Sequence, residues 1–316
     1  MASRELKDLV AAWENLRDKQ QAVLATVVRT EGSTYRKVGA RMLFSPEGSL
    51  AGSVSGGCLE ADLLGQAGRV AESGSRIVVY DSTAESDIVW GFGLGCNGIV
   101  TILLQPYPQA AQVMEVLKAV ATTRTAAILE TTLEGPLLGS FRVLESQEPR
   151  SDQVLVERIE PPKRIVLFGA GFDAPPLVRI SQEIGWDMTV LDHRPETLSK
   201  LAAVDTVEAR PGHAPEELLR DADAAVVMTH NYLNDLQILR QLSAFSIPYV
   251  GLLGPTARRQ RLQAELTQTG CRAMSIASPI GLDIGASGPH EIALAIVAEI
   301  QAHLTNRAGG RLSVQK

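Results

Sequence analysis

Residues 164–174 read Arg-Ile-Val-Leu-Phe-Gly-Ala-Gly-Phe-Asp-Ala, an apolar run that leads directly into a glycine-rich turn. The apolar run predicts a buried strand, and the pattern G-x-G-x-x-A predicts a tight turn followed by the start of a helix. Asp192 ends the next apolar segment, where dinucleotide-binding folds place the acid that binds a ribose. These residues predict a Rossmann-like domain with a doubly wound parallel sheet.

Each residue of this turn has its own expected role. Gly169 allows the tight turn, and Gly171 lets a phosphate approach the amides at the helix N-terminus. Asp192 is expected to accept a hydrogen bond from a ribose hydroxyl, whereas Arg194 favours a 2′-phosphate or another anion. NAD is therefore not singled out as the ligand, and glycines that serve packing alone are the alternative.

The rest of this half of the chain supports the same fold. Strand-like and helical segments alternate from residue 164 to about residue 304, which predicts parallel strands joined by right-handed crossovers. His230 follows the strand expected at 224–229, at the carboxyl edge where such folds bind ligands. A loop histidine without a ligand is the alternative.

The half before residue 146 has a different pattern. Its helical and strand-like segments do not alternate regularly, which predicts an α+β domain. Prolines and charges from Ser146 to Lys163 predict a linker with one short strand at 154–156. We therefore expect an α/β protein with an N-terminal α+β domain at residues 1–145, a linker at 146–163, a Rossmann-like domain at 164–308 and a tail at 309–316.

Composition and charge exclude several classes of protein. The 30 basic and 36 acidic residues give a net charge of −6, which argues against binding to a nucleic acid backbone. Only 4% of the residues are aromatic, too few for base stacking. Three cysteines predict a reduced protein, and no apolar run approaches the roughly 18 residues of a membrane span. We expect a cytoplasmic protein that contacts neither nucleic acid nor a membrane.

Two glycine-rich elements of the first half contain cysteines. Residues 55–60, Ser-Gly-Gly-Cys-Leu-Glu, stand where an expected strand turns into a helix predicted over 57–73. That helix would place Cys58 in its first turn, where the dipole favours a thiolate, and would let the Gly56 and Gly57 amides hold an anion. A small buried cysteine beside a tight turn is the alternative.

The second element, residues 91–98, has four glycines in eight residues and includes Cys96. Such backbone freedom indicates close approach of a ligand or another chain, or alternatively a flexible loop. Cys58 and Cys96, without a nearby pair of histidines, are too few for a structural zinc site, so no metal site is expected. The histidines stand singly and form no recognisable catalytic constellation, which favours a carrier over a turnover catalyst.

Taken together, several motifs resemble those of the XdhC/CoxI family. The matching segments are residues 52–60 and 93–98 in the first half, and 167–171, 191–194, 229–231 with Asp235, and 278–285 in the second. The resemblance covers nearly the whole chain, in the family's order and two-domain layout. Two departures are Phe172, where the family usually has His, and Asn97, where it has Gly.

The resemblance implies an accessory role. Family members bind molybdenum cofactor (molybdopterin), assist its sulfuration with a cysteine desulfurase, deliver it to a xanthine dehydrogenase-type molybdenum hydroxylase, and are commonly homodimers. The alternative is an NAD(P)-dependent oxidoreductase or a nucleotide-sensing regulatory protein, with a nucleotide at the Rossmann turn. The candidate cofactor-binding residues are Ser55, Gly56, Gly57, Cys58, Glu60, Cys96, Gly169, Gly171, Asp192, Arg194 and His230.

Overall fold

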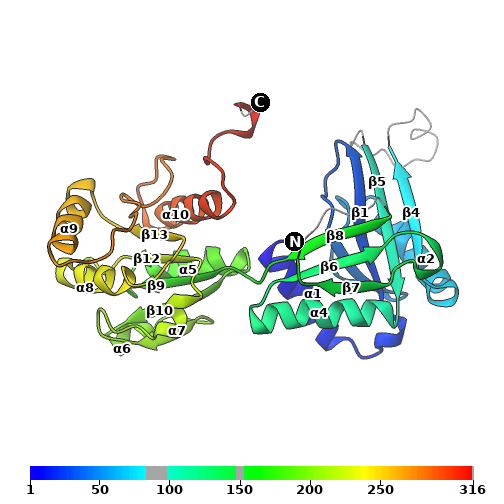
Figure 1. Ribbon diagram of the computed structural model, residues 1–316, viewed down its shortest axis with the longest axis horizontal. Coiled ribbons are helices and arrows are strands. Elements are labelled where there is room, and N and C mark those ends of the chain that lie inside the picture. Colours follow the sequence, from blue (N-terminus) through cyan, green and yellow to red (C-terminus); the bar gives the residue numbers. More distant parts are fainter. Residues whose placement is uncertain (83–97, 147–152, 315–316) are drawn as a thin grey trace. The chain divides into compact units, whose positions relative to one another are not determined.

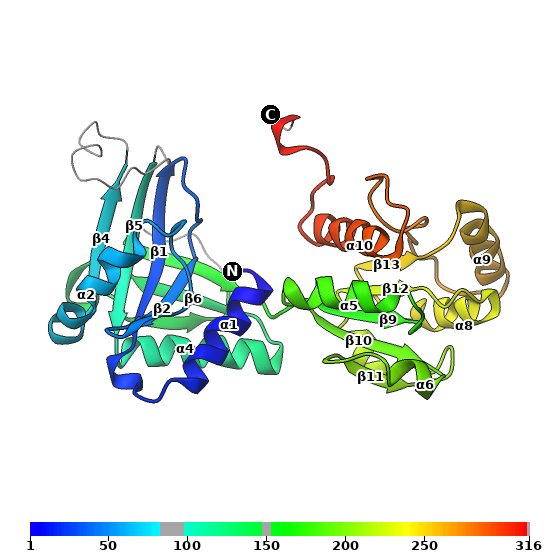
Figure 2. The same cartoon turned by 180° about the vertical axis from the view of Figure 1, so that it is seen from behind.

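The chain forms two compact units, residues 1–162 and 163–316, in a computed structural model that describes residues 1–82, 98–146 and 153–314 (Figures 1 and 2). Each unit has its own sheets and its own hydrophobic core. Within the described ranges, none of the helices has the length and apolar character needed to cross a bilayer.

The first unit is built around a five-stranded antiparallel sheet in the order β3-β2-β1-β5-β4. A three-stranded antiparallel sheet has the order β7-β6-β8. These sheets and the helices beside them make up the expected α+β arrangement. The strands are β1 (Val23–Gly32), β2 (Arg41–Ser45), β3 (Gly48–Gly52), β4 (Arg76–Asp81), β5 (Gly98–Pro106), β6 (Ala127–Thr132), β7 (Phe141–Leu144) and β8 (Val154–Ile159).

Helices cover both faces of the five-stranded sheet. α1 (Ser3–Asn15) and α4 (Gln109–Thr123) pack on one face together with Leu24 of β1. α2 (Glu60–Ser73) packs on the other face, together with Val23 of β1. Successive side chains of a strand point to opposite faces, so a strand covered on both sides is buried at every position, as β1 is over residues 23–28.

One strand lies where the sequence predicts a linker. β8 pairs with β6 along its whole length, and its Ile159 is buried in the core of the first unit. Glu157 of β8 forms an ion pair with Arg41 of β2, whose side chain is 2% exposed. The short strand predicted at 154–156 is therefore present as β8, but it is part of the first unit and not of a linker, because its backbone and side-chain partners lie there.

The second unit contains a five-stranded parallel sheet in the order β11-β10-β9-β12-β13. The strand that comes first in the sequence, β9, lies in the middle, and later strands are added on one side and then on the other. This doubly wound order confirms the predicted Rossmann-like fold. The strands are β9 (Arg164–Phe168), β10 (Asp187–Asp192), β11 (Asp205–Glu208), β12 (Ala224–Val227) and β13 (Tyr249–Leu252).

Helices also cover both faces of this parallel sheet (Figure 1). Ile165 and Leu167 of β9 face one core, and Val166 and Phe168 face the other, which explains the unbroken apolar run before the glycine turn. The loops that follow the strands lie at the carboxyl edge of the sheet and begin with the glycine turn. The helices are α5 (Ala174–Glu183) and α10 (Pro289–Leu304) on one face, and α7 (Glu216–Arg220), α8 (Tyr232–Leu242) and α9 (Thr256–Gln268) on the other; α6 (Pro195–Leu198) follows β10.

Candidate functional site

The glycine turn after β9 is closely packed at its first glycine and open at its second. Gly169 has a φ of +109°, and a Cβ at this position would lie 2.6 Å from the carbonyl oxygen of Met228. Only glycine fits there without displacing the backbone after β12. A Cβ at Gly171 would meet no atom within 4 Å, so the packing of the protein itself does not require that glycine.

Asp192, at the end of β10, holds the neighbouring loops together. Its carboxylate accepts hydrogen bonds from the backbone N–H of Ala170 at 2.8 Å and of Arg194 at 3.0 Å. The Arg194 guanidinium adds two more, from Nε at 2.9 Å and from Nη2 at 2.8 Å. His193 Nδ1 lies 3.3 Å from the same carboxylate. The predicted ribose acceptor is therefore already engaged by groups of this chain.

These contacts change the proton affinity of Asp192. Burial opposes ionisation, because it removes water from the carboxylate. The hydrogen bonds from the Arg194 side chain and from the backbone N–H groups of Ala170 and Arg194 outweigh that effect and lower the pKa of Asp192 to about 2. Asp192 and Arg194 thus form a permanent ion pair at neutral pH.

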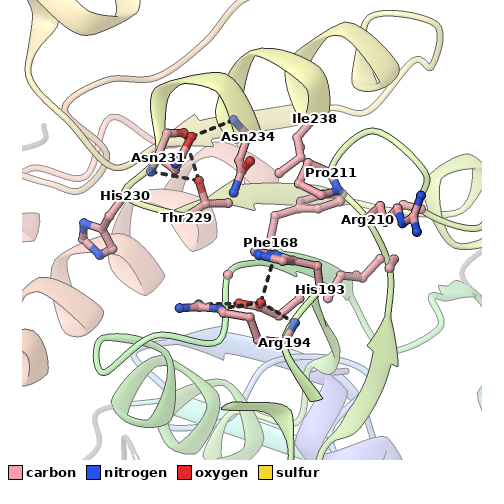
Figure 3. A pocket seen from close by; sticks show the side chains of 15 residues that line it. Phe168, His193, Arg194, Arg210, Pro211, Thr229, His230, Asn231, Asn234 and Ile238 are labelled. Carbon is pink, nitrogen blue, oxygen red and sulfur yellow. Dashed lines mark hydrogen bonds and ion pairs between the residues drawn. The ribbon is translucent and has the colours of Figure 1, made fainter. Parts of the chain in front are cut away.

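Asp192 and Arg194 lie in the wall of a cavity of about 340 Å³ at the carboxyl edge of the sheet. Figure 3 shows Arg194 and Arg210 at separate places in the wall formed by the loops after β10 and β11, with Thr229, Asn231 and Asn234 across the cavity from Arg194. Of the predicted residues, Gly169 and His230 also line this cavity, whereas Gly171 does not. A cavity of this size, with polar groups around an apolar interior, has the dimensions of a small-molecule site.

His230 is held at the edge of this cavity by a residue of the glycine turn. Its Nε2 lies 2.8 Å from a carboxylate oxygen of Asp173, whose side chain is 7% exposed. The rings of His230 and Phe172 are stacked, with centroids 6.1 Å apart and an angle of 11° between their planes. Phe172 is therefore a surface aromatic residue beside His230, at the position where the sequence departs from the family pattern.

The turn that carries His230 is fixed from behind by Asp235. His230 has a φ of +57°, in the left-handed region that residues other than glycine rarely adopt. Asp235 accepts a hydrogen bond from the Thr229 hydroxyl at 2.5 Å and two from the guanidinium of Arg258 in α9, at 2.5 and 3.1 Å. Because Asp235 is buried, this network compensates the strained backbone of the turn.

In the first unit, the turn at residues 55–60 is closed by its own side chains. The Ser55 hydroxyl donates to the Glu60 carboxylate and accepts from the backbone N–H of Gly57 at 3.0 Å and of Leu59 at 3.2 Å. Glu60 also accepts from the N–H groups of Ser55 and Leu59. The Gly57 amide, expected to be available to an anion, is thus engaged, and a carboxylate of the chain itself occupies the N-terminus of α2.

The Glu60 carboxylate is stabilised as an anion in this position. Burial opposes its ionisation, but hydrogen bonds from the Ser55 hydroxyl and nearby backbone N–H groups hold the pKa of Glu60 below its ordinary value. α2 begins at Glu60, so Cys58 precedes the helix. The prediction that Cys58 lies in the first turn of the helix is therefore wrong. Helix ends depend on capping contacts that spacing alone does not define within one or two residues.

Cys58 is partly buried and lines a small cavity of about 30 Å³. Tyr35 packs over Gly56 at the same place, and Ser82 and Gly98 complete the wall. Cys96 and most of the second glycine-rich element lie outside the described residues. In the part of the chain that the structure describes, there is no cluster of three or more His, Cys, Asp or Glu side chains able to hold a metal ion.

Two residues were missed in the sequence: Arg210, which lines the second-unit cavity, and Asp173, which contacts His230 at its edge. Asp173 lies inside the glycine turn itself, and Arg210 follows β11 at the same edge of the sheet. The signal that could have found Arg210 is its place after a parallel strand, since the ligand sites of such folds lie where strands end. The remaining predicted residues fall into two groups, one in each unit.

Two family descriptions match the chain. Residues 15–81 match the XdhC and CoxI family, and residues 165–300 match the XdhC Rossmann domain. A solved structure from Bacillus halodurans, described as a xanthine dehydrogenase, superposes with a TM-score of 0.84 at 29% sequence identity and covers 100% of this chain and 98% of its own. The fold and the sequence motifs therefore agree over both units.

Two relatives match over almost the full length. A Bacillus subtilis (strain 168) protein, named as a probable subunit of xanthine dehydrogenase, is 36% identical over 90% of this chain and 94% of the relative. The Escherichia coli (strain K12) protein named molybdenum cofactor insertion chaperone PaoD is 26% identical, over 92% of this chain and 85% of the relative. This protein belongs to the XdhC and CoxI family.

Proposed function

We propose that this protein is an accessory factor that binds molybdenum cofactor as cargo and inserts it into a xanthine dehydrogenase-type molybdenum hydroxylase. The observation that carries the proposal is the match, over 92% of the chain, to a relative named as a cofactor insertion chaperone. The relative at 36% identity, named after xanthine dehydrogenase, supports the class of client.

The surroundings of Cys58 are compatible with the molybdenum-bearing end of such a cargo. A thiolate is a soft ligand of the kind that suits soft metal and sulfur centres. The adjoining cavity of about 30 Å³ has room for a group the size of one water molecule and not for a pterin ring. Cys58 would therefore contact the end of the cargo from the surface and would not enclose it.

Sulfuration of the cargo together with a cysteine desulfurase is the finer part of this proposal. A thiol that solvent reaches, as Cys58 does, is suited to sulfur chemistry because the thiolate is the reactive form. Cys96 is a second candidate, since it stands in the family-like motif at residues 93–98. We also propose a homodimer, which light scattering of the purified protein measures directly.

Cargo binding is tested by purifying the protein without oxygen from a host that makes molybdenum cofactor. Bound cofactor is oxidised to a fluorescent pterin, which is separated and measured against the amount of protein. We expect pterin in a substantial fraction of the molecules. Protein that carries no pterin, from a host whose molybdoenzymes are active, contradicts the proposal.

The role of Cys58 is tested by activation of a client. An apo-hydroxylase of the xanthine dehydrogenase type is incubated with loaded accessory factor, and the recovered hydroxylase activity is measured. Cys58→Ala is expected to lower activation about tenfold or more, whereas Cys271→Ala, a matched control in the second unit, leaves it unchanged. Full activation with Cys58→Ala would make Cys58 a structural residue.

A further inference from the structure

We infer that the cavity of the second unit binds a phosphate monoester attached to a planar heterocycle, with Arg194 and Arg210 as the phosphate-binding residues. This ligand differs from the dinucleotide that the glycine pattern suggests. The inference goes beyond cargo delivery, because it holds whether the phosphate belongs to a pterin or to a nucleotide.

The first step concerns the acceptor capacity of Asp192. A carboxylate offers about four acceptor positions, and Asp192 already receives hydrogen bonds from Ala170 N and from Arg194 N, Nε and Nη2. A ribose diol that bound there would have to displace the charged, two-pronged contact of Arg194. That exchange replaces a charge-assisted pair by neutral hydrogen bonds and is unfavourable.

The second step concerns the direction of Arg194. Its Nε and Nη2 hold Asp192, while the side chain remains 42% exposed and lines the cavity. The two-pronged contact with Asp192 thus fixes the orientation of the guanidinium in the cavity wall. A planar guanidinium oriented in this way matches the oxygen geometry of a phosphate. Asp192 acts here as a positioning residue.

The third step is the charge of the cavity wall. Arg210 is exposed, and no hydrogen bond or ion pair joins its guanidinium to another residue of the described ranges. Asp192 is the single carboxylate among the described residues that line the cavity, and Arg194 neutralises it. Arg210 therefore adds an uncompensated positive charge, which favours a doubly charged monoester.

The fourth step is the shape of the remaining wall. Apolar groups form the interior of the cavity between the β-strand ends and α8 (Figure 3). Such a surface suits a flat ring, while the polar groups at the rim set its orientation. The apolar residues are Phe168, Leu191, Ala209, Pro211, Ala214 and Ile238.

A dinucleotide is disfavoured at the glycine turn for a separate reason. Its pyrophosphate would bind at the N-terminus of α5, where Asp173 is the N-cap residue and its side chain is 7% exposed. A buried carboxylate at this point repels a second anion, because burial leaves little water to screen the two charges. His230 is the partner that the structure gives to this carboxylate.

The test is calorimetric titration of the full-length protein with matched pairs of probes. One pair is adenosine 5′-monophosphate and adenosine, which differ in the phosphate monoester. The other pair is the oxidised pterin phosphate released from molybdoenzymes and the same pterin after phosphatase treatment. We expect the phosphorylated member of at least one pair to bind about tenfold or more tightly than its partner, and inorganic phosphate to compete with it.

Variants locate the effect. Arg210→Ala is expected to weaken binding of the phosphorylated probe about tenfold and to leave the unphosphorylated partner unchanged. Arg220→Ala removes another exposed arginine of the same unit, outside the cavity lining, and should change neither. A preference within the pterin pair assigns the phosphate to the cargo, and a preference within the adenosine pair assigns it to a nucleotide; both support the inference.

Two results would overturn it. In one, neither pair shows a preference for the phosphate. In the other, Arg210→Ala weakens both members of a pair equally. These outcomes are independent of the cargo proposal, because protein without bound pterin can still discriminate adenosine 5′-monophosphate from adenosine, and protein loaded with pterin can fail to discriminate either pair.

Discussion

The contacts of Asp192 predict a pH-dependent contribution to the stability of the second unit. Its pKa in the folded protein is about 2, compared with an ordinary value of 3.8, and its side chain is 3% exposed, so solvent screens the shift little. A difference of one pKa unit corresponds to about 1.4 kcal/mol. We therefore expect Asp192→Asn to lower the free energy of unfolding of this unit by about 2 kcal/mol at pH 7.

The direction of the pH dependence follows from the lowered pKa. A carboxyl with a lowered folded-state pKa stabilises the fold above its unfolded-state pKa and loses that effect as the pH falls toward the folded-state pKa. The difference between wild type and Asp192→Asn should thus be constant from pH 7 to about pH 5. It should shrink to about 1 kcal/mol near pH 3.

Urea unfolding followed by hydrogen-exchange mass spectrometry measures this difference for peptides of the second unit alone. Asp205→Asn, an exposed aspartate on β11, is the matched control and should change the free energy of unfolding little at any of these pH values. A difference that stays the same from pH 7 to pH 3, or that is near zero at pH 7, would refute the role given to the Asp192 contacts.

Two further predictions concern stability and are checked by the same unfolding measurements. Gly169→Ala and Gly57→Ala both place alanine at a φ of +109°, but only at Gly169 does the new Cβ collide with backbone. Gly57→Ala should therefore lower the free energy of unfolding by about 1–2 kcal/mol, and Gly169→Ala should lower it clearly more. Equal losses would show that the collision is relieved. Glu157→Ala leaves Arg41 buried without its carboxylate and should destabilise the first unit by about 3–5 kcal/mol. Glu160→Ala removes an exposed ion pair in the same region and should cost less than about 1 kcal/mol. Similar effects of the two variants would contradict a stabilising role of the buried Arg41–Glu157 pair.

The elements that the sequence predicts well are those with local causes. The run Ile165–Phe168, the glycines after it and the regular alternation of strands and helices were enough to predict a Rossmann-like sheet. Residues 154–159 show the opposite case. Prolines and charges around them predict a linker with a short strand at 154–156, but β8 belongs to the first unit because it pairs with β6 and because Glu157 meets Arg41, 116 residues away.

The candidate site shows the same division. The motifs alone identified the turns that contain Cys58, Gly169, Asp192 and His230, because glycine spacing and strand ends are local features. Which partner each group has was decided by the tertiary structure. Spacing assigned Asp192 to a ribose, whereas the folded chain gives its carboxylate to Ala170 and Arg194.

The sequence by itself determined the family, the fold class of each unit and the glycine-rich turns. Only the tertiary structure decided that Asp173 holds His230 and that Arg210 shares a cavity with Arg194. The physical reason is that helix and turn formation depend on neighbours a few residues apart. Charge pairing and cavity shape depend instead on which strand ends the sheet order brings together.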